Sequence, residues 1–242
     1  MSVAATHPIP EISVVIPVFN EVDNVAQLAG EIVAALQSKS FEILFVDDGS
    51  NDGTAAAIRE LRSRIPQVRL LRHSFCSGQS AAVCSGVRHA RAEWIATLDG
   101  DGQNDPADIP KLYESRFVAE LVMGNRVQRR DTWLRHAQSR VANGVRGWLL
   151  GDGTPDTGCG IKVMHRGQFL ELPRFDHMHR FLPALFLRAG ARVVSVPVAH
   201  RPRARGTSKY GLFDRLWVGI VDIFGVMWLR RRFRPGLQIR ED

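Results

Sequence analysis

Two aspartates separated by one glycine, Asp99 and Asp101, follow the apolar run Trp94–Leu98. The length and apolarity of this run predict a buried strand, with both carboxylates emerging at its carboxyl end. Such a pair offers hard oxygen ligands to a divalent cation and leaves other coordination positions for phosphate oxygens. Gly100 allows the turn to pass close to a bulky ligand, and the Gln103 carbonyl is a further candidate ligand. Taken alone, an Asp-x-Asp segment is more typical of a solvated turn.

Alternating elements must position these carboxylates. Apolar runs predict four strands in the N-terminal half, at residues 12–18, 41–46, 68–71 and 94–98. Helical patterns lie between them, one reaching about residue 37 and two spanning 54–64 and 80–90. This alternation is typical of βαβ units around a parallel sheet. The second half is less regular: strands are expected at 121–124, 161–165 and 192–198, and helices at 132–150 and 179–189.

Polar clusters follow three of the predicted strands. They are Asn20-Glu21, the segment Asp47–Ser50, and the pair Asp99 and Asp101. In open parallel sheets, ligands bind at the carboxyl ends of the strands. The coincidence of three clusters at this edge predicts a binding site there.

A metal-bound nucleoside diphosphate would need such a constellation. Asp99 and Asp101 would hold Mg²⁺ or Mn²⁺, which stabilises the charge that develops on a departing diphosphate. Asp47 or Asp48 could accept hydrogen bonds from a ribose or a base. The chain has no Walker loop, no Gly-x-Gly-x-x-Gly fingerprint after the first strand and no serine elbow. Its close histidine pair, His177 and His179, has no ligand neighbour in sequence and is interpreted as packing rather than metal binding.

The positive charge is concentrated near the C-terminus. The 242 residues carry a formal net charge of +7, and residues 201–242 contain ten Lys or Arg against four Asp or Glu. A basic region of this kind indicates an anionic partner, such as nucleic acid, membrane lipid or a phosphorylated substrate. Nucleic acid is disfavoured, because the chain shows no helix-turn-helix, zinc-finger or aromatic RNA-binding pattern.

Residues 212–229 are almost wholly apolar and predict a helix. Its charges, Asp214, Arg215 and Asp222, fall within one arc of about 100°, and three more arginines follow at 230–232. Each charge would cost roughly 2.5–3.5 kcal/mol at the centre of a bilayer, so a simple span is disfavoured. The pattern favours a helix lying in the plane of a membrane. The alternative is a helix packed on the protein's own core or on a partner subunit.

The compartment is expected to be the cytoplasm. Residues 1–10 contain no Lys or Arg and no apolar stretch typical of a signal peptide. The three cysteines have no metal-ligand spacing and are typical of free thiols in a reducing environment.

Three motifs resemble those of the family 2 glycosyltransferases with the GT-A fold: Val15–Glu21, Val46–Thr54 and Leu98–Asp101. Within that family the chain looks most like the polyprenyl-phosphate glycosyltransferases of the dolichyl-phosphate mannose synthase type. The segments that carry this narrower resemblance are 101–106, 124–126 and 203–210, and the likeness covers about residues 10–211.

The resemblance implies an α/β fold with a Rossmann-like half and a mostly parallel central sheet. Residues 1–211 would form the GT-A domain, with a nucleotide-sugar half at 10–105 and an acceptor half at 106–211. Residues 212–242 would form an amphipathic helix and basic tail that associates with a membrane or with a partner.

The resemblance also implies roles for single residues. The nucleoside pocket would be lined by Pro17, Phe19, Glu21, Val46 and Asp48. The metal would be held by Asp99, Asp101 and Gln103, with the Gly100 backbone near the donor. The donor or acceptor phosphates would be contacted by Arg126, Arg203 and Lys209, and the acceptor phosphate also by Arg135 and Ser139. The catalytic residues would be Asp99, Asp101 and Arg126.

The implied activity is inverting, metal-dependent transfer of a sugar from a GDP- or UDP-sugar to a polyprenyl phosphate at the cytoplasmic membrane face. A lipid phosphate is already an anion, so its attack needs no general base. Residues 157–162 depart from the family's acceptor-side pattern and leave the sugar open. Two alternatives remain: a family 2 enzyme with a polysaccharide or protein acceptor, and a non-catalytic, membrane-bound GT-A scaffold.

Overall fold

A computed structural model describes residues 8–126, 144, 146–201 and 212–233, with only the backbone for 212–218. Its described strands form one seven-stranded sheet in the order β3-β2-β1-β4-β6-β5-β7. The strands are β1 (Ile12–Val18), β2 (Phe41–Asp47), β3 (Val68–Arg72), β4 (Trp94–Thr97), β5 (Leu121–Arg126), β6 (Lys162–His165) and β7 (Val193–Val198). β6 runs antiparallel to β4 and β5, and the other strand pairs are parallel.

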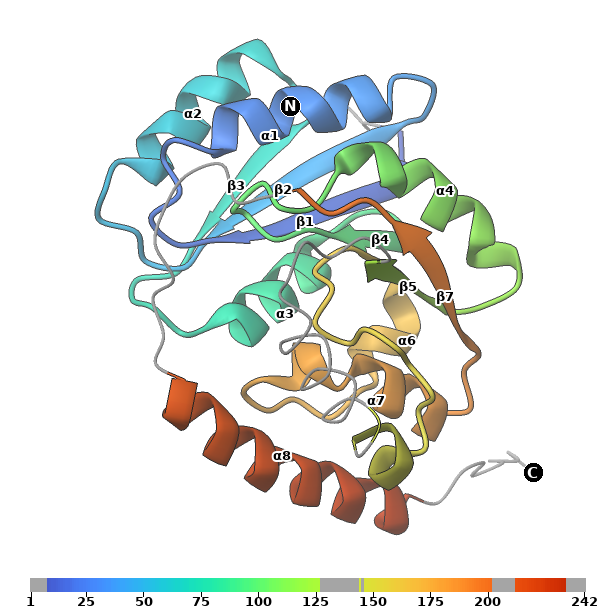
Figure 1. The fold of residues 1–242 in the computed structure, drawn as a ribbon. Helices are drawn as coiled ribbons and strands as arrows, with labels where there is room; N and C mark the ends of the chain where they lie inside the picture. The colour runs from blue at the N-terminus through green and yellow to red at the C-terminus, as the bar shows by residue number, and fades with distance from the viewer. Residues whose placement is uncertain (1–7, 127–143, 145, 202–211, 234–242) are drawn as a thin grey trace, which may run out of the picture.

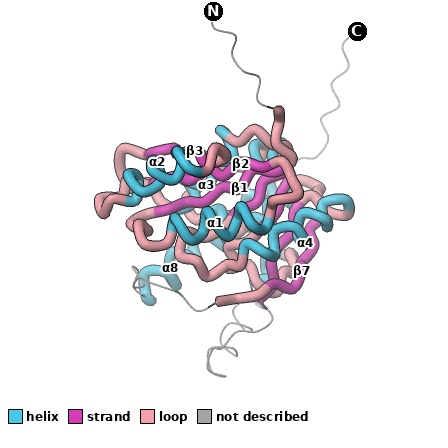
Figure 2. The backbone as a smooth tube through the Cα atoms, turned by 90° about the horizontal axis from the view of Figure 1, so that it is seen from above, coloured by secondary structure: helices cyan, strands magenta, loops and turns pink. Residues whose placement is uncertain are grey.

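Helices cover both faces of this sheet (Figures 1 and 2). One face carries α1 (Val25–Ala35), α2 (Thr54–Arg64) and α4 (Ile109–Glu114). The other carries α3 (Gln79–His89), α6 (Arg166–Leu170), α7 (Leu182–Arg188) and α8 (Leu212–Arg232). Three short 3₁₀ helices lie at Pro106–Asp108, Ser115–Phe117 and Met178–Arg180.

Successive residues of β1 enter two separate hydrophobic cores. Val14 and Ile16 pack with α1 on one face, whereas Val15 packs with α3 on the other. All three are fully buried. A sheet covered on both faces requires strands that are apolar on both sides, which explains why the runs predicted for β1 and β2 are hydrophobic apart from Ser13 and Glu42, whose side chains hydrogen-bond each other at 2.6 Å.

Helix α3 lies unusually close to the sheet because of Gly86. A Cβ atom at this position would overlap Val15 Cγ1 and come within 3.1 Å of Val46 Cγ2. The close packing fixes the direction of α3, so that its first residue, Gln79, reaches the carboxyl ends of the strands. Gln79 contacts the acidic turn there.

The predicted fold class is confirmed: the sheet is mixed but mostly parallel, and its helices alternate with its strands in the first half. The strand expected at 161–165 is β6, and it is antiparallel. The helix expected at 179–189 starts only at Leu182, because Met178–Arg180 form a separate 3₁₀ turn before it. Most of the helix expected at 132–150 lies outside the described residues.

The predicted C-terminal helix is present as α8, which runs along the α7 side of the molecule in Figure 1. Its buried side contributes Val226 to the core that lies between the sheet, α3 and α7. Within the described part of the chain, every helix is too short or too polar to span a bilayer.

Candidate active site

The turn after β4 packs against the end of β1. Val15 pairs with Thr97, so Gly100 lies level with Val18 at the carboxyl edge of the sheet. A Cβ atom on Gly100 would approach Val18 Cγ1 to 2.8 Å and the Pro17 carbonyl oxygen to 3.1 Å. Gly100 therefore lets the acidic turn sit directly on the end of β1, next to Pro17.

Asp99 is crowded by polar groups at this edge. Its Oδ1 accepts a 2.8 Å hydrogen bond from Gln79 Nε2, and its backbone N–H donates to Asn104 Oδ1 at 3.1 Å. Burial raises the pKa of Asp99, the charges of Lys162 and Arg126 lower it, and the charge of Asp101 raises it again. Asp99 and Asp101 are thus close enough to repel each other, and two cations offset part of that repulsion.

Lys162 is the buried cation of this centre, on β6 beside β4. Its side chain is 5% exposed, and Nζ donates to the Cys159 carbonyl. Burial lowers the pKa of Lys162, while the nearby Asp99 carboxylate raises it. Lys162 and Asp99 line one small cavity of about 20 Å³ together with Gly160 and His179.

Gly160 leaves the space that Asp99 occupies. A Cβ atom at Gly160 would overlap both Asp99 Oδ2 and Asn104 Oδ1. Its carbonyl also accepts a 2.9 Å hydrogen bond from Thr97 Oγ1, which holds this loop against β4.

We expect Gly160→Ala to lower the free energy of unfolding by about 1–3 kcal/mol, the usual cost of overpacking. The added methyl group must displace Asp99, so the metal-dependent activity that the sequence predicts should fall as well. Urea titration and an activity assay measure the two effects. Gly30→Ala is the control, because a Cβ atom at Gly30, inside α1, meets nothing within 4 Å. Equal stability of the two variants would contradict the prediction.

Asp101 and Gln103 form the far side of the acidic turn. Gln103 N–H donates to Asp101 Oδ1 at 3.1 Å, and Gly102 adopts a left-handed φ of 72°. The Gln103 carbonyl accepts a 3.0 Å hydrogen bond from Arg201 N–H. The Arg201 guanidinium in turn pairs with Asp105 at 2.7 Å, so the segment after β7 is fastened to this turn.

The acidic turn suits a hard divalent cation. Asp99 and Asp101 follow the same strand with one glycine between them, and the charge of Asp101 raises the pKa of Asp99. Mg²⁺ is commonly held by one or two carboxylates together with the phosphates of a substrate. No group of three His, Cys, Asp or Glu side chains that could hold a metal ion occurs among the described residues.

Asp48, which follows β2, is held by the loop before α3. Its carboxylate accepts hydrogen bonds from Ser77 N–H at 2.9 Å, Gly78 N–H at 2.8 Å and His73 Nδ1 at 2.7 Å. Burial alone would raise the pKa of Asp48, but these hydrogen bonds and one from Cys76 lower it overall. Asp48 stays ionised and fixes this loop beside the nucleoside pocket that the sequence predicts.

The other predicted nucleoside residues are divided between the edge and the core. Pro17, Phe19 and Glu21 are partly exposed at the end of β1, and the Glu21 carboxylate accepts from Asn24 at 2.6 Å. Val46 has a fully buried side chain within the core under α3. The structure therefore brings Pro17, Phe19 and Glu21 to the acidic edge, but it does not place the Val46 side chain there.

Arg126, at the end of β5, is oriented by Asp156. The guanidinium makes a bidentate pair with this carboxylate, with Nε–Oδ2 at 2.6 Å and Nη2–Oδ1 at 2.7 Å. Burial lowers the pKa of Arg126, but the carboxylates of Asp156 and Asp99 raise it overall. Arg126 therefore belongs to the same charged group as Asp99. The carboxylate of Asp156 fixes the orientation of the Arg126 guanidinium.

His179 borders the charged centre as a neutral side chain. Its Nδ1 lies 2.7 Å from Ser80 Oγ, so it packs against α3 as the sequence suggested. Burial first, and then the charges of Lys162 and Arg180, lower the pKa of His179 to about 3.

This lowered pKa predicts that the free energy of unfolding decreases as the pH falls below 6.5. Between the ordinary pKa of 6.5 and about 3, the unfolded chain binds a proton at His179 that the folded chain does not. The contribution is complete above pH 6.5 and is lost below it, at up to about 1.4 kcal/mol per pH unit. The variant His179→Gln has no titrating group at this position, so its stability lacks this pH dependence. The difference in the free energy of unfolding between wild type and variant should therefore shrink from pH 7.5 to pH 5. Urea titrations at both pH values measure it, and a pH-independent difference would contradict it.

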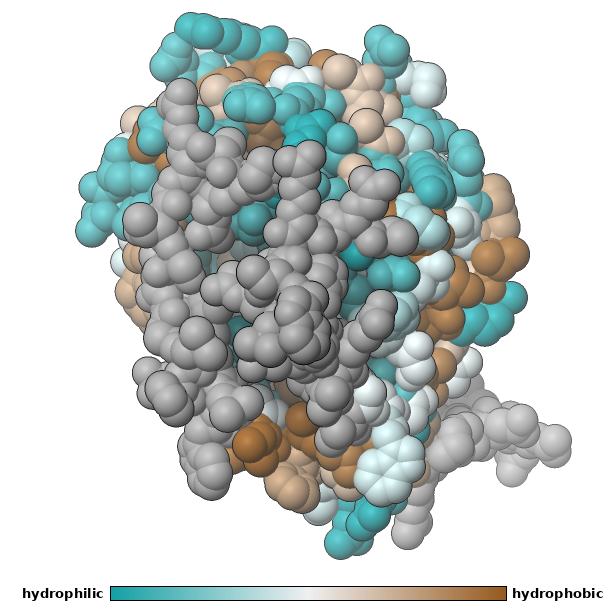
Figure 3. Space-filling model, in the orientation of Figure 1, coloured by the Kyte–Doolittle hydropathy of each residue, from teal (hydrophilic) through white to brown (hydrophobic). Residues whose placement is uncertain are grey.

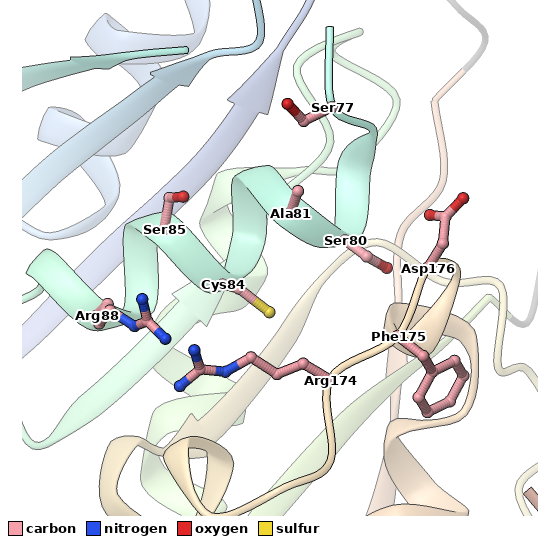
Figure 4. Close-up of a pocket in the computed structure, with 9 residues that line it drawn as sticks. All are labelled: Ser77, Ser80, Ala81, Cys84, Ser85, Arg88, Arg174, Phe175 and Asp176. Carbon is pink, nitrogen blue, oxygen red and sulfur yellow. The ribbon is translucent and has the colours of Figure 1, made fainter.

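A second cavity, of about 320 Å³, lies on the other side of α3 (Figure 4). Arg88 and Arg174 point toward each other beside Cys84. Burial raises the pKa of the Cys84 thiol, and the Arg174 charge opposes this. Ser80, which also lines this cavity, hydrogen-bonds His179 and so separates it from the acidic edge.

Several site residues were not expected from the sequence. Lys162, Gly160 and Asp156 all lie in or next to residues 157–162, the segment that departs from the family pattern. A lysine among apolar strand residues is a signal that could have identified Lys162. Four predicted phosphate-contacting residues lie outside the described part of the chain: Arg135, Ser139, Arg203 and Lys209.

Comparison with known sequences matches this chain to one family. The sequence profile described as glycosyl transferase family 2 matches residues 13–172, which include all but the first residue of β1, the strands β2 to β6 and the acidic turn. A dodecaprenyl-phosphate galacturonate synthase of Rhizobium johnstonii is 36% identical over 235 residues, covering 93% of this chain and 69% of the relative. An undecaprenyl-phosphate 4-deoxy-4-formamido-L-arabinose transferase of Edwardsiella ictaluri is 36% identical over 208 residues, covering 83% of this chain and 63% of the relative.

Solved structures support the same fold. Glucosyl-3-phosphoglycerate synthase from Mycobacterium tuberculosis, in complex with Mn²⁺, UDP and glucosyl-3-phosphoglycerate, matches with a TM-score of 0.64 at 18% identity. The match covers 91% of this chain and 80% of that one. The same enzyme in complex with Mg²⁺ and UDP also matches with a TM-score of 0.64, at 19% identity. At this identity, the comparison shows a common fold.

Proposed function

The chain belongs to glycosyl transferase family 2, and from this membership and its charged edge we propose that it transfers a sugar from a nucleotide sugar to a polyprenyl phosphate. The observation that carries the proposal is the 36% identity, over 93% of the chain, to an enzyme named for a polyprenyl-phosphate product. The second relative is also named for a polyprenyl phosphate, but with a different sugar.

We assign residues 10–105 to donor binding and residues 106–211 to acceptor binding. Pro17, Phe19 and Glu21 would line the nucleoside pocket, next to the loop that Asp48 fixes. Asp99, Asp101 and the Gln103 carbonyl would hold Mg²⁺ or Mn²⁺, which when bound neutralises charge on the diphosphate leaving group. Residues 212–242 would associate with a membrane or with a partner.

The reaction requires alignment and charge neutralisation more than proton transfer. An oxygen of the lipid phosphate attacks the anomeric carbon, and the bond from that carbon to the diphosphate oxygen breaks. One displacement inverts the anomeric centre, and the nucleoside diphosphate leaves with the bonding electrons. Arg126, held by Asp156, is proposed to stabilise phosphate charge. Arg135, Ser139, Arg203 and Lys209 are proposed to bring the two anionic substrates together.

We place this reaction at the cytoplasmic face of the cell membrane, because the acceptor carries a lipid chain and the donor is a soluble nucleotide sugar. The basic C-terminal region, with ten Lys or Arg among residues 201–242, would attract anionic lipid or a membrane-embedded partner.

The test is a panel of UDP- and GDP-sugars, including UDP-galacturonate, incubated with purified protein, a polyprenyl phosphate, and Mg²⁺ or Mn²⁺. Formation of a lipid-phosphate sugar with inverted anomeric configuration is the expected result. Transfer to a polysaccharide or protein acceptor, with none to the lipid, would instead support the alternative family 2 activity. Absence of nucleotide-sugar binding by calorimetry would support a non-catalytic scaffold.

A further inference from the structure

The outward side of α8 is apolar. Val221, Phe224 and Trp228 are 55%, 65% and 60% exposed, although they are large hydrophobic residues. Their spacing of three and four residues places them in one stripe along the helix. Such a stripe is costly in water unless something covers it.

The opposite side of α8 is already occupied by the protein's own core. Val226 is 1% exposed, and Ile223, Met227 and Leu229 pack against the same core. Arg188 Nε donates to the Leu229 carbonyl at 3.0 Å. Because this side fixes the orientation of the helix, the outward stripe cannot also turn into the fold.

A basic cluster follows the apolar stripe at the end of α8. Arg230 is turned toward the protein, where it donates to the carbonyl of Leu150. Arg231 and Arg232 at the end of α8 are exposed. Hydrophobic residues gather along the edge of the molecule where α8 runs (Figure 3).

We propose that this surface, formed by Val221, Phe224, Trp228, Arg231 and Arg232, docks in the plane of an anionic lipid bilayer. Tryptophan is enriched at membrane–water interfaces, and clustered arginines complement anionic headgroups, so the combined chemistry fits lipid. The proposal rests on the proposed function, because it names the surface that brings the enzyme to a lipid acceptor.

The docking helix is joined to the active site. Asp222 Oδ2 lies 3.3 Å from His177 Nδ1, and two residues later His179 lines the cavity beside Asp99. A bilayer that holds α8 therefore holds the loop bordering the acidic edge at a fixed distance from its surface.

The experiment measures co-sedimentation of the full chain with vesicles of phosphatidylcholine alone and with vesicles that also contain phosphatidylglycerol, an anionic lipid. The double variant Phe224→Glu/Trp228→Glu is compared with Phe117→Glu, which adds a charge at another exposed phenylalanine, 74% exposed. We expect the double variant to bind anionic vesicles at least about tenfold more weakly, and the control to bind like wild type. Added salt should weaken wild-type binding.

Transfer to a short-chain, water-soluble acceptor separates this proposal from the proposed function. The double variant should keep wild-type activity on that acceptor, with an unchanged melting temperature, while losing activity on vesicle-borne acceptor. Equal vesicle binding by the double variant and wild type would overturn the docking surface, whatever the activity. So would a wild-type protein that ignores vesicles and self-associates through this face. Loss of transfer by wild type on every acceptor would overturn the function instead.

Discussion

Asp101→Ala should lower the rate of sugar transfer by roughly 10³-fold, a loss typical of removing one group that stabilises transition-state charge. Asp101 lies beside Asp99 at the end of β4 and is proposed to hold the cation shared with the donor diphosphate. Without the Asp101 carboxylate the cation would be held less firmly, and less of the negative charge on the leaving diphosphate would be neutralised. Steady-state assays at saturating Mn²⁺ measure the effect.

The fold should survive this change, because Asp101 lies in a partly exposed turn outside both hydrophobic cores. The control is Glu60→Ala, which removes a carboxylate that pairs with Arg64 on the exposed side of α2 and should leave transfer unchanged. A fully active Asp101→Ala enzyme would reject the metal assignment.

Lys162→Met should lower the free energy of unfolding by up to about 3–5 kcal/mol, because it removes a buried cation whose charge offsets that of the Asp99 carboxylate. Methionine keeps most of the volume and packing of the lysine side chain, so the decrease in the free energy of unfolding measures the effect of removing the Lys162 charge. Denaturant titration in metal-free buffer measures it.

The single variant Lys162→Met is compared with the double variant Asp99→Asn/Lys162→Met. Removing two buried charges of opposite sign is often less costly than removing one of them, so the double variant should recover most of the lost stability. Equal destabilisation of the single and double variants would show that Lys162 does not compensate Asp99.

The first half of the fold was predictable because local pattern and tertiary structure agree there. The run Ile12–Val18 is apolar apart from Ser13, and it is buried on both faces of the sheet as β1. Helix α2 spans Thr54–Arg64, as its pattern predicts. The acidic turn was placed correctly because its strand ends where the apolar run ends.

The second half of the site depends on contacts that are distant in sequence. Lys162 reaches Asp99 because β6 inserts antiparallel between β4 and β5, and no local pattern specifies that pairing. The bidentate pair of Arg126 with Asp156 joins residues 30 positions apart. Gly160 has its role only because the Asp99 side chain fills the space above it.

The two interpretations of the C-terminal helix were presented as alternatives, yet α8 combines features of both. Val226 and its neighbours pack on the core, while Val221, Phe224 and Trp228 stay exposed. Sequence periodicity identified a wide apolar surface, but only the tertiary contacts divide it into a buried side and an exposed side.

The most direct test of the central claim is diffraction at the manganese absorption edge, from crystals grown with Mn²⁺ and the nucleoside diphosphate of the active donor. We predict an anomalous peak coordinated by the carboxylates of Asp99 and Asp101 and by oxygens of the diphosphate. A diphosphate bound elsewhere, or a manganese ion that these two carboxylates do not touch, would contradict the account.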